Sequence, residues 1–382
     1  MTVDPARRRV IDRRTGPEIR GATKGGPLSF RSTAAFAALL SALAAPAGAS
    51  AATKVVSIGP SRSVEEAFNK LGADVNDFFP HGVTIHAGDS VTFRPSQFHT
   101  VDFPAKGQKP VGLFAAAGTV SGALDSAGNP FWFNGQPAIG INSPLAASLY
   151  GKKVTYTGAK RVESGLPLRP KLKPFTVRFP KVGTYTYYCN VHIGMKGTVR
   201  VVSRRHRIPS AKGDAKTLAA QIARDMKTAT ALAKTAVAPG NVSVGASGKG
   251  GVEFYAMLPA TQTVPVGTTL KFSMSALTFE DHTATFGPGD PEHDPSSYLG
   301  MLAASFNSPV FAPAAVYPSD PPGTTGTLTP TSHGNGFWNS GLMDNSSATP
   351  LPNSESVTFT APGTYTFYCM IHPFMKGTVI VQ

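Results

Sequence analysis

Two segments of this chain are nearly the same, and this repeat constrains the fold more than any other feature of the sequence. Residues 183–202 read GTYTYYCNVHIGMKGTVRVV and residues 363–382 read GTYTFYCMIHPFMKGTVIVQ, with 13 of 20 positions identical and no gap. Upstream, FHTVDF at 98–103 corresponds to DHTATF at 281–286. A repeat on this scale predicts two copies of one structural unit.

Length and composition favour two β domains. A chain of 382 residues suits two domains, each large enough for its own core. The 39 Gly and 33 Pro residues interrupt short runs of Val, Thr, Phe and Tyr, which is typical of brief strands joined by turns. We therefore predict an all-β protein with one domain at residues 52–204, called the first copy, and another at 241–382, called the second copy.

The two copies are separated by a linker, residues 205–240, with a helical pattern. Within residues 211–236, apolar side chains recur at helical spacing, and no Gly or Pro follows Gly213. These side chains are Leu218, Ile222, Met226 and Ala229. The spacing predicts one amphipathic helix, which we expect to pack on a neighbouring domain.

The first 51 residues have the pattern of a signal peptide. An Arg-rich stretch precedes an apolar run at 33–45 and the small residues AGASAA at 47–52, which predicts cleavage near Ala51. The run has 13 residues, fewer than the roughly 20 needed to cross a bilayer, so stable membrane insertion is not expected. The mature protein is expected to be exported and to be extracellular, cell-wall-associated or periplasmic.

Each copy contains one cysteine, followed by a histidine three residues later and a methionine six residues later. These residues are Cys189, His192 and Met195 in the first copy, and Cys369, His372 and Met375 in the second. In an exported protein two cysteines commonly form a disulfide, but a disulfide would explain neither neighbour. A thiolate, an imidazole and a thioether are ligands that suit copper cycling between two oxidation states. We therefore predict free cysteines and a copper site in each copy.

A trigonal copper site of this kind needs a second imidazole, with the methionine as a long axial ligand. His99 and His282 are the candidates, because each lies in the same flank, H-T-[VA]-x-F, upstream of its cysteine. A single histidine in such a run is more often structural. Two at matching repeat positions favour the ligand role.

These motifs resemble the cupredoxins, the blue copper family that includes plastocyanin, azurin and amicyanin, and CMIHPFM is most similar to the short amicyanin loop. The resemblance implies Greek-key β-sandwich domains, one type 1 copper per domain and transfer of single electrons. It implies the copper ligands His99, Cys189, His192 and Met195 in the first copy, and His282, Cys369, His372 and Met375 in the second.

The sequence departs from the family in two ways. Thr100 and Thr283 follow the first histidines, where many cupredoxins have Asn; a hydroxyl there can still bond near the cysteine. The first histidine and the cysteine are separated by 90 and 87 residues, so each copy must carry an insertion. Trp132 and Trp338, in the related segments NPFWFNGQ and NGFWNSG, are expected to be buried aromatics beside turns.

Enzymatic activity is not expected. Multicopper oxidases bind a trinuclear cluster through paired HxH motifs, and no HxH occurs in this sequence. The His-Cys step that links the copper sites of nitrite reductases is also absent. The acidic segment GDPEHDP at 289–295 could bind a hard cation, but it is more typical of a surface turn.

The function that we predict is a secreted blue copper protein that carries single electrons between redox partners. Electrons would pass through His192 and His372, beside apolar docking residues: Ile193, Gly194, Pro373 and Phe374. The same ligands would serve a copper-binding or storage module without a redox partner. A cell-surface scaffold with incidental metal is a third interpretation.

Charge differs between the copies. Residues 52–204 carry 18 basic and 8 acidic residues, whereas 241–382 carry 3 basic and 9 acidic. Within the first copy, 151–207 holds 14 Lys or Arg and one acid, Glu163. We expect the second copy to pack near this basic segment and the remaining positive surface to recruit a redox partner with an acidic docking surface. Two solvated surfaces of different charge are the alternative. Export makes nucleic acid an improbable partner.

Overall fold

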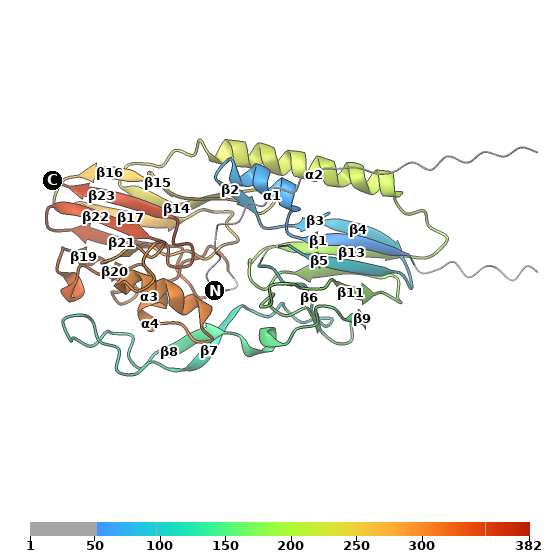
Figure 1. The fold of residues 1–382 in the computed structure, drawn as a ribbon, viewed down its shortest axis with the longest axis horizontal. Coiled ribbons are helices and arrows are strands. Elements are labelled where there is room, and N and C mark those ends of the chain that lie inside the picture. Colours follow the sequence, from blue (N-terminus) through green and yellow to red (C-terminus); the bar gives the residue numbers. More distant parts are fainter. Residues whose placement is uncertain (1–51, 97, 348) are drawn as a thin grey trace, which may run out of the picture. The chain divides into compact units, whose positions relative to one another are not determined.

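Two five-stranded sheets form the first copy in this computed structural model, which describes residues 52–382 except 97 and 348 (Figure 1). The first sheet, in spatial order, contains β3 (Phe78–Phe79), β1 (Thr53–Ile58), β5 (Ser90–Pro95), β11 (Phe175–Arg178) and β9 (Lys153–Thr155). The second contains β10 (Val162–Glu163), β6 (Asp102–Phe103), β12 (Gly183–Tyr188), β13 (Lys196–Val202) and β4 (Gly82–His86). The predicted signal peptide, residues 1–51, lies outside the described residues.

The second copy repeats this arrangement strand for strand. One sheet contains β19 (Gly326–Leu328), β21 (Ser354–Phe359), β17 (Thr269–Met274), β14 (Asn241–Gly248), β15 (Val252–Leu258) and β2 (Ala73–Val75). The other contains β16 (Thr261–Val264), β23 (Lys376–Val381), β22 (Gly363–Tyr368), β18 (Thr285–Phe286) and β20 (Trp338–Asn339). Apart from β2, each strand occupies the place of its first-copy counterpart. The sequence repeat therefore corresponds to a repeat of topology.

The register of the repeated strands is also the same in both copies. β12 and β13 pair antiparallel with Gly183 opposite Val201, and β22 and β23 pair with Gly363 opposite Val381. The last strand of each copy then pairs in parallel, β13 with β4 and β23 with β16. The ligand motifs thus lie on equivalent turns.

The sheets of each copy enclose a core of alternating apolar side chains. In the first copy, Val91 and Phe93 of β5 and Val199 and Val201 of β13 are buried in one cluster, while the residues between them on each strand are more exposed. Burying such a side chain contributes about 1.5–3 kcal/mol. An equivalent cluster fills the second copy. The predicted all-β sandwich fold is confirmed.

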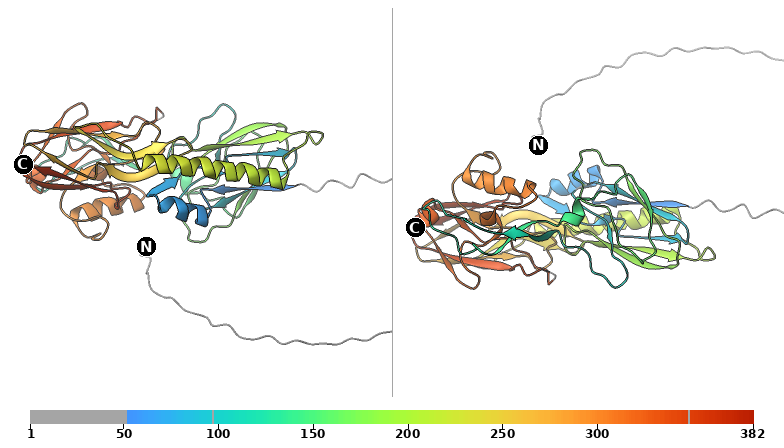
Figure 2. Two further views of the ribbon diagram at one scale, coloured as in Figure 1. Left: turned by 90° about the horizontal axis from the view of Figure 1, so that it is seen from above. Right: turned by 90° about the horizontal axis from the view of Figure 1, so that it is seen from below.

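Helix α2 (Ala211–Leu232) forms where the linker was predicted to be helical (Figure 2). The hydroxyl of Ser210 caps its first turn by accepting the amide of Gly213 at 3.2 Å. The four predicted apolar residues face one cluster, which also contains Phe68 of α1 (Arg62–Asn69). Gln221 accepts the amide of His81 at 2.9 Å, and the helix also contacts β14 and β15. The helix therefore packs on both copies, as expected of a linker that docks.

Parts of the first copy are built into the second. β2 adds to the edge of β15, with Val75 opposite Val252 and Ala73 opposite Phe254. The hairpin of β7 (Phe114–Thr119) and β8 (Pro137–Ile141) continues into a loop whose side chains pack on second-copy residues. The remaining helices are η1 (Ser143–Ala146), α3 (Tyr298–Ala304), η2 (Ser305–Asn307), α4 (Pro313–Val316) and η3 (Ser332–Gly334). The described residues of the two copies and the linker consequently belong to one compact unit.

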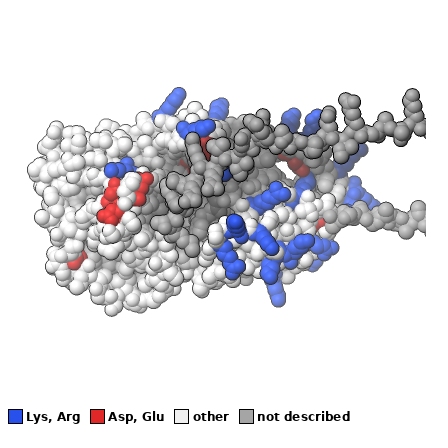
Figure 3. All heavy atoms as spheres, in the orientation of Figure 1, with Lys and Arg blue, Asp and Glu red and all other residues white. Residues whose placement is uncertain are grey.

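The Lys and Arg residues in the basic segment of the first copy make no ion pair with the second copy among the described residues. Figure 3 shows many Lys and Arg side chains over the first copy and few over the second on the face in view. Within the described part of the chain, however, no Lys or Arg of 151–207 forms an ion pair with an acid of 241–382. Strand pairing and apolar packing join the copies instead. Across the described residues, no helix has the length and apolarity to span a membrane.

Candidate metal centres

Both predicted ligand loops are short turns between paired strands. β12 ends at Tyr188 and β13 begins at Lys196, so the turn carries the cysteine, the histidine and the methionine of the motif. The amide of Cys189 donates to the carbonyl of Met195 at 3.0 Å, and the amide of Met195 donates to the carbonyl of His192 at 3.1 Å. The corresponding bonds in the second copy are 3.1 and 2.8 Å. The backbone thus fixes the spacing of all three side chains.

In the first copy the turn meets His99, which follows β5 on the neighbouring sheet. The Nδ1 atoms of His99 and His192 are 2.8 Å apart, and they lie 3.9 and 3.6 Å from the Cys189 sulfur. All three side chains are buried. Three potential ligand atoms therefore converge in a site shielded from solvent.

The second copy holds the same constellation. The Nδ1 atoms of His282 and His372 are 3.1 Å apart, and they lie 3.6 and 3.7 Å from the Cys369 sulfur. Met375 and its counterpart Met195 are each 1% exposed and belong to the same clusters as their cysteines. The structure thus places every predicted ligand beside its predicted partners.

The donor atoms fit a copper ion. Two imidazole nitrogens and a sulfur that point at one another bring lone pairs together, and a cation between them would satisfy all three. A thiolate, two imidazoles and a nearby thioether form the set that type 1 copper uses. Both cysteines are free in the structure, as predicted.

Burial decides the protonation of the second site. It raises the pKa of the Cys369 thiol to about 11. It also lowers the pKa of His282 to about 3, assisted by the adjacent His372. At Cys189 burial is outweighed by hydrogen bonds from His192 and His99, which bring the pKa of the thiol well below its usual range. In the second site, where the pKa of His372 is also lowered by burial, neutral imidazoles keep their lone pairs available for a metal.

The threonine that follows each first histidine ties its segment to the ligand loop. The Thr100 hydroxyl accepts the amide of Asn190 at 2.7 Å, and the Thr283 hydroxyl accepts the amide of Met370 at 2.8 Å. The backbone amides of both threonines point at their cysteine sulfurs, at 3.5 and 3.4 Å. The expected hydroxyl near the cysteine is therefore present in both copies. It accepts a hydrogen bond from the backbone amide of the residue that follows the cysteine.

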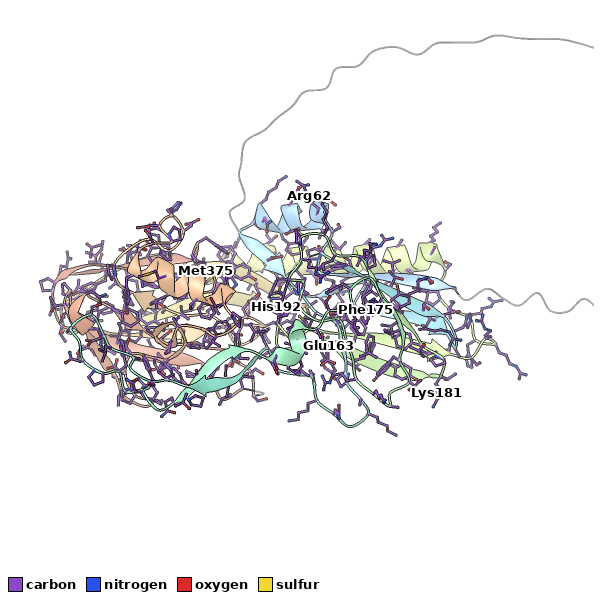
Figure 4. The ribbon with its side chains drawn as sticks, turned by 60° about the horizontal axis from the view of Figure 1, so that its bottom comes forward. Arg62, Glu163, Phe175, Lys181, His192 and Met375 are labelled. Carbon is purple, nitrogen blue, oxygen red and sulfur yellow. The ribbon has the colours of Figure 1, made fainter. Side chains whose placement is uncertain are left out.

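A buried carboxylate that the sequence analysis missed lies between the two centres. Glu280 Oε1 is 3.2 Å from Nε2 of His192, and Oε2 is 3.7 Å from Nε2 of His372. Its Oε1 also accepts from Asn76 Nδ2 and from the Tyr255 hydroxyl, both at 2.6 Å. Figure 4 shows His192 where the first copy meets the second. Both ligand-loop histidines thus face one acid.

The two centres also share a cavity. Its volume is about 620 Å³, and its wall includes His99, His192, Tyr255, Glu280 and His372. The sequence predicted that the outer edges of His192 and His372 would lie on two separate docking surfaces. The structure instead directs both of them into one space between the copies.

The predicted apolar docking surfaces have different outcomes. Phe374 is 54% exposed, as expected. Gly194 is also exposed, but the ring of Phe279 in the second copy lies close to it, because a Cβ atom at this position would be 2.4 Å from that ring. A docking role for Gly194 stays a prediction.

The remaining motifs are structural. Trp338 is buried in the second core and donates to Asp320 at 2.9 Å, while half-buried Trp132 donates to the carbonyl of Pro318 at 2.9 Å. In the acidic segment, Asp290 and His293 form a local pair, and the His293 side chain is 73% exposed. This is the surface turn that the sequence favoured.

Comparison with known proteins gives the following relatives. The family described as copper binding proteins, plastocyanin/azurin family, matches residues 342–382. Amicyanin-alpha of Methylorubrum extorquens is 63% identical over 27 residues, which are 7% of this chain and 23% of that protein. The match thus spans about a quarter of the length of that relative. The C-terminal ligand loop therefore matches a family of copper-binding proteins.

Solved structures of cupredoxins are similar to parts of the chain. Oxidized plastocyanin from Dryopteris crassirhizoma has 23% identity and a TM-score of 0.20, and the alignment covers 37% of this chain and 99% of that one. The purple cupredoxin from Nitrosopumilus maritimus has 16% identity and a TM-score of 0.18, with 37% and 98% covered.

Proposed function

We propose that this protein is a two-domain cupredoxin that binds one type 1 copper in each copy and carries single electrons. The domains would be residues 52–204 and 241–382, joined by the linker 205–240. The observation that carries this proposal is the duplicated ligand set. In each copy two Nδ1 atoms and one sulfur lie within 3.9 Å of one another, beside a buried methionine on the same turn.

Copper bound at such a site supplies one-electron redox chemistry. The protein's part is to hold the ligands in a single arrangement. The paired strands fix the turn, and Thr100 and Thr283 fasten it to the segment of the first histidine. Because the cysteines and first histidines are almost fully buried, a substrate has little access to the metal. Rigid, shielded ligands favour electron transfer over catalysis at the metal, so we propose no enzymatic activity.

The redox partner and the location of the protein belong to the same proposal. Export through the signal peptide would place the protein in the periplasm, at the cell wall or outside the cell. Phe374, beside the second ligand loop, is the exposed apolar residue at which a partner would dock. The excess of Lys and Arg on the first copy favours a partner with an acidic docking surface.

Copper loading of the mature protein tests the proposal. We expect two Cu(II) per chain, an intense thiolate-to-copper absorption band and the EPR signal of type 1 copper, with rapid reduction in stopped flow. Cys189→Ser and Cys369→Ser should each remove about half of the band and leave the other site intact. A colourless complex with ordinary EPR would refute the electron-transfer function. A stoichiometry of one would refute the duplicated site.

A further inference from the structure

Glu280 is the one acid, among the described residues, whose carboxylate lies within 4 Å of a ring nitrogen of a histidine in each metal centre. It is 7% exposed and directly precedes the segment of His282. Its four side-chain partners come equally from the two copies: Asn76 and His192 from the first, Tyr255 and His372 from the second. A buried carboxylate is costly unless donors surround it, so this arrangement exists only when the copies are joined.

The contacts lie on the far side of each imidazole from the cysteine. His192 and His372 turn Nδ1 towards the sulfur and Nε2 towards Glu280. A carboxylate on the second nitrogen of a ligand histidine fixes the ring orientation and raises its basicity. Here one carboxylate faces the second nitrogen of a ligand histidine in both sites, at 3.2 Å from His192 and at the longer, electrostatic distance of 3.7 Å from His372.

We propose that Glu280 is a positioning residue shared by the two centres, which orients His192 and His372 and provides the route for electron exchange between them within the chain. This inference rests on the proposed function. In the exchange, one copper loses one electron and is oxidised, and the other gains that electron and is reduced. The Nε2 protons stay on the imidazoles, so the step needs no further reactant.

The repeat shows that this feature is particular to the junction. Gln97 stands two residues before His99 in the sequence, at the position that Glu280 occupies before His282. The acid therefore does not belong to the duplicated ligand motif. Glu280 instead depends on the junction of the two copies, because each copy alone would supply only half of its side-chain partners.

The test is Glu280→Gln in the full mature chain, which keeps the shape and removes the charge. Copper affinity is measured by competition with a chelator, in Cys189→Ser and Cys369→Ser backgrounds that isolate each site. We expect both affinities to fall about tenfold, although the sites belong to different copies. After rapid reduction of the two-copper protein, redistribution of the electron between sites should slow by a similar factor. Its rate should not depend on protein concentration.

Glu253→Gln is the matched control, because Glu253 is a buried acid of the same region whose oxygens bond Thr278 and Phe279 rather than a ligand histidine. It should leave both affinities and the redistribution rate unchanged. If Glu280→Gln does not fold, Tyr255→Phe replaces it, since it removes one donor to the acid and should weaken both sites by a smaller factor.

The outcomes separate the two proposals. A wild-type protein that binds no copper refutes the proposed function, and the inference falls with it. Normal type 1 copper in the wild type, with affinities or redistribution unmoved by the Glu280 variant, refutes the inference alone. Weakening of only the second-copy site would also overturn it, because a residue private to one copy would do the same.

Discussion

Replacing Asp225 should make the protein more stable at neutral and alkaline pH. Asp225 lies on α2, is 4% exposed and has one carboxylate oxygen without a hydrogen bond. Burial, followed by repulsion from Asp77, raises its pKa from 3.8 to about 7. The folded protein therefore keeps a proton that the unfolded chain releases. Stability must fall as pH rises through this window and level off above it.

The magnitude follows from the size of the shift. Three pKa units correspond to at most about 4 kcal/mol, and screening by solvent reduces the expected effect to about 2 kcal/mol. Asp225→Asn has nearly the same shape and no charge to desolvate. Its free energy of unfolding should equal that of the wild type near pH 4 and exceed it by about 2 kcal/mol at pH 8.

Urea unfolding of the metal-free protein, followed by circular dichroism between pH 4 and 8, measures this difference. Asp214→Asn is the control on the same helix, because Asp214 is partly exposed and pairs with Lys54 at 2.6 Å. It should lose no more than about 1 kcal/mol, with little change across pH 5 to 8. If the curves of Asp225→Asn and wild type run parallel, the buried acid is ionised in the folded protein and the reasoning is wrong.

Two further predictions concern the junction between the copies. Gly194→Ala should destabilise the protein by about 2–3 kcal/mol, because the new Cβ meets the ring of Phe279 and φ is +119°. Gly122→Ala is the control, because Gly122 also has a positive φ but lies in open space. It should cost about 1 kcal/mol in the same denaturation assay. Small-angle scattering of the mature protein should give the same radius of gyration at low and high salt, because strand pairing and apolar packing are not screened. Two independently moving lobes would contradict this.

The turns that carry the ligand motifs could be predicted from the sequence because their determinants are local. A cysteine, histidine and methionine on a turn between two alternating strands are set by spacing alone, and the structure places β22 and β23 around Cys369 as expected. The partnership with His99 and His282 required the repeat, since it spans about 90 residues. Helix α2 could also be predicted from a local signal, because apolar residues recur at helical spacing along its whole length.

The junction could not be predicted, because its contacts depend on packing between distant segments. β2 is three residues long and has no pattern that distinguishes an edge strand of the second copy from one of the first. Glu280 had one weak signal, an acid that replaces glutamine at an equivalent repeat position. Charge asymmetry predicted a contact between the copies, but among the described residues no Lys or Arg of 151–207 forms an ion pair with an acid of 241–382, and strand pairing and apolar packing join the copies.

The pairing of β2 with β15 has a consequence for how the protein is made. Residues 73–75 leave the ribosome before residues 252–258 have been synthesised. Roughly half of the chain must therefore be synthesised after β2 before β2 can pair with β15, and such long-range pairing is slow. During that time an unpaired strand and the apolar side of the hairpin are open to wrong partners. Maturation of this protein should thus depend on holding the early half unaggregated until the late half arrives.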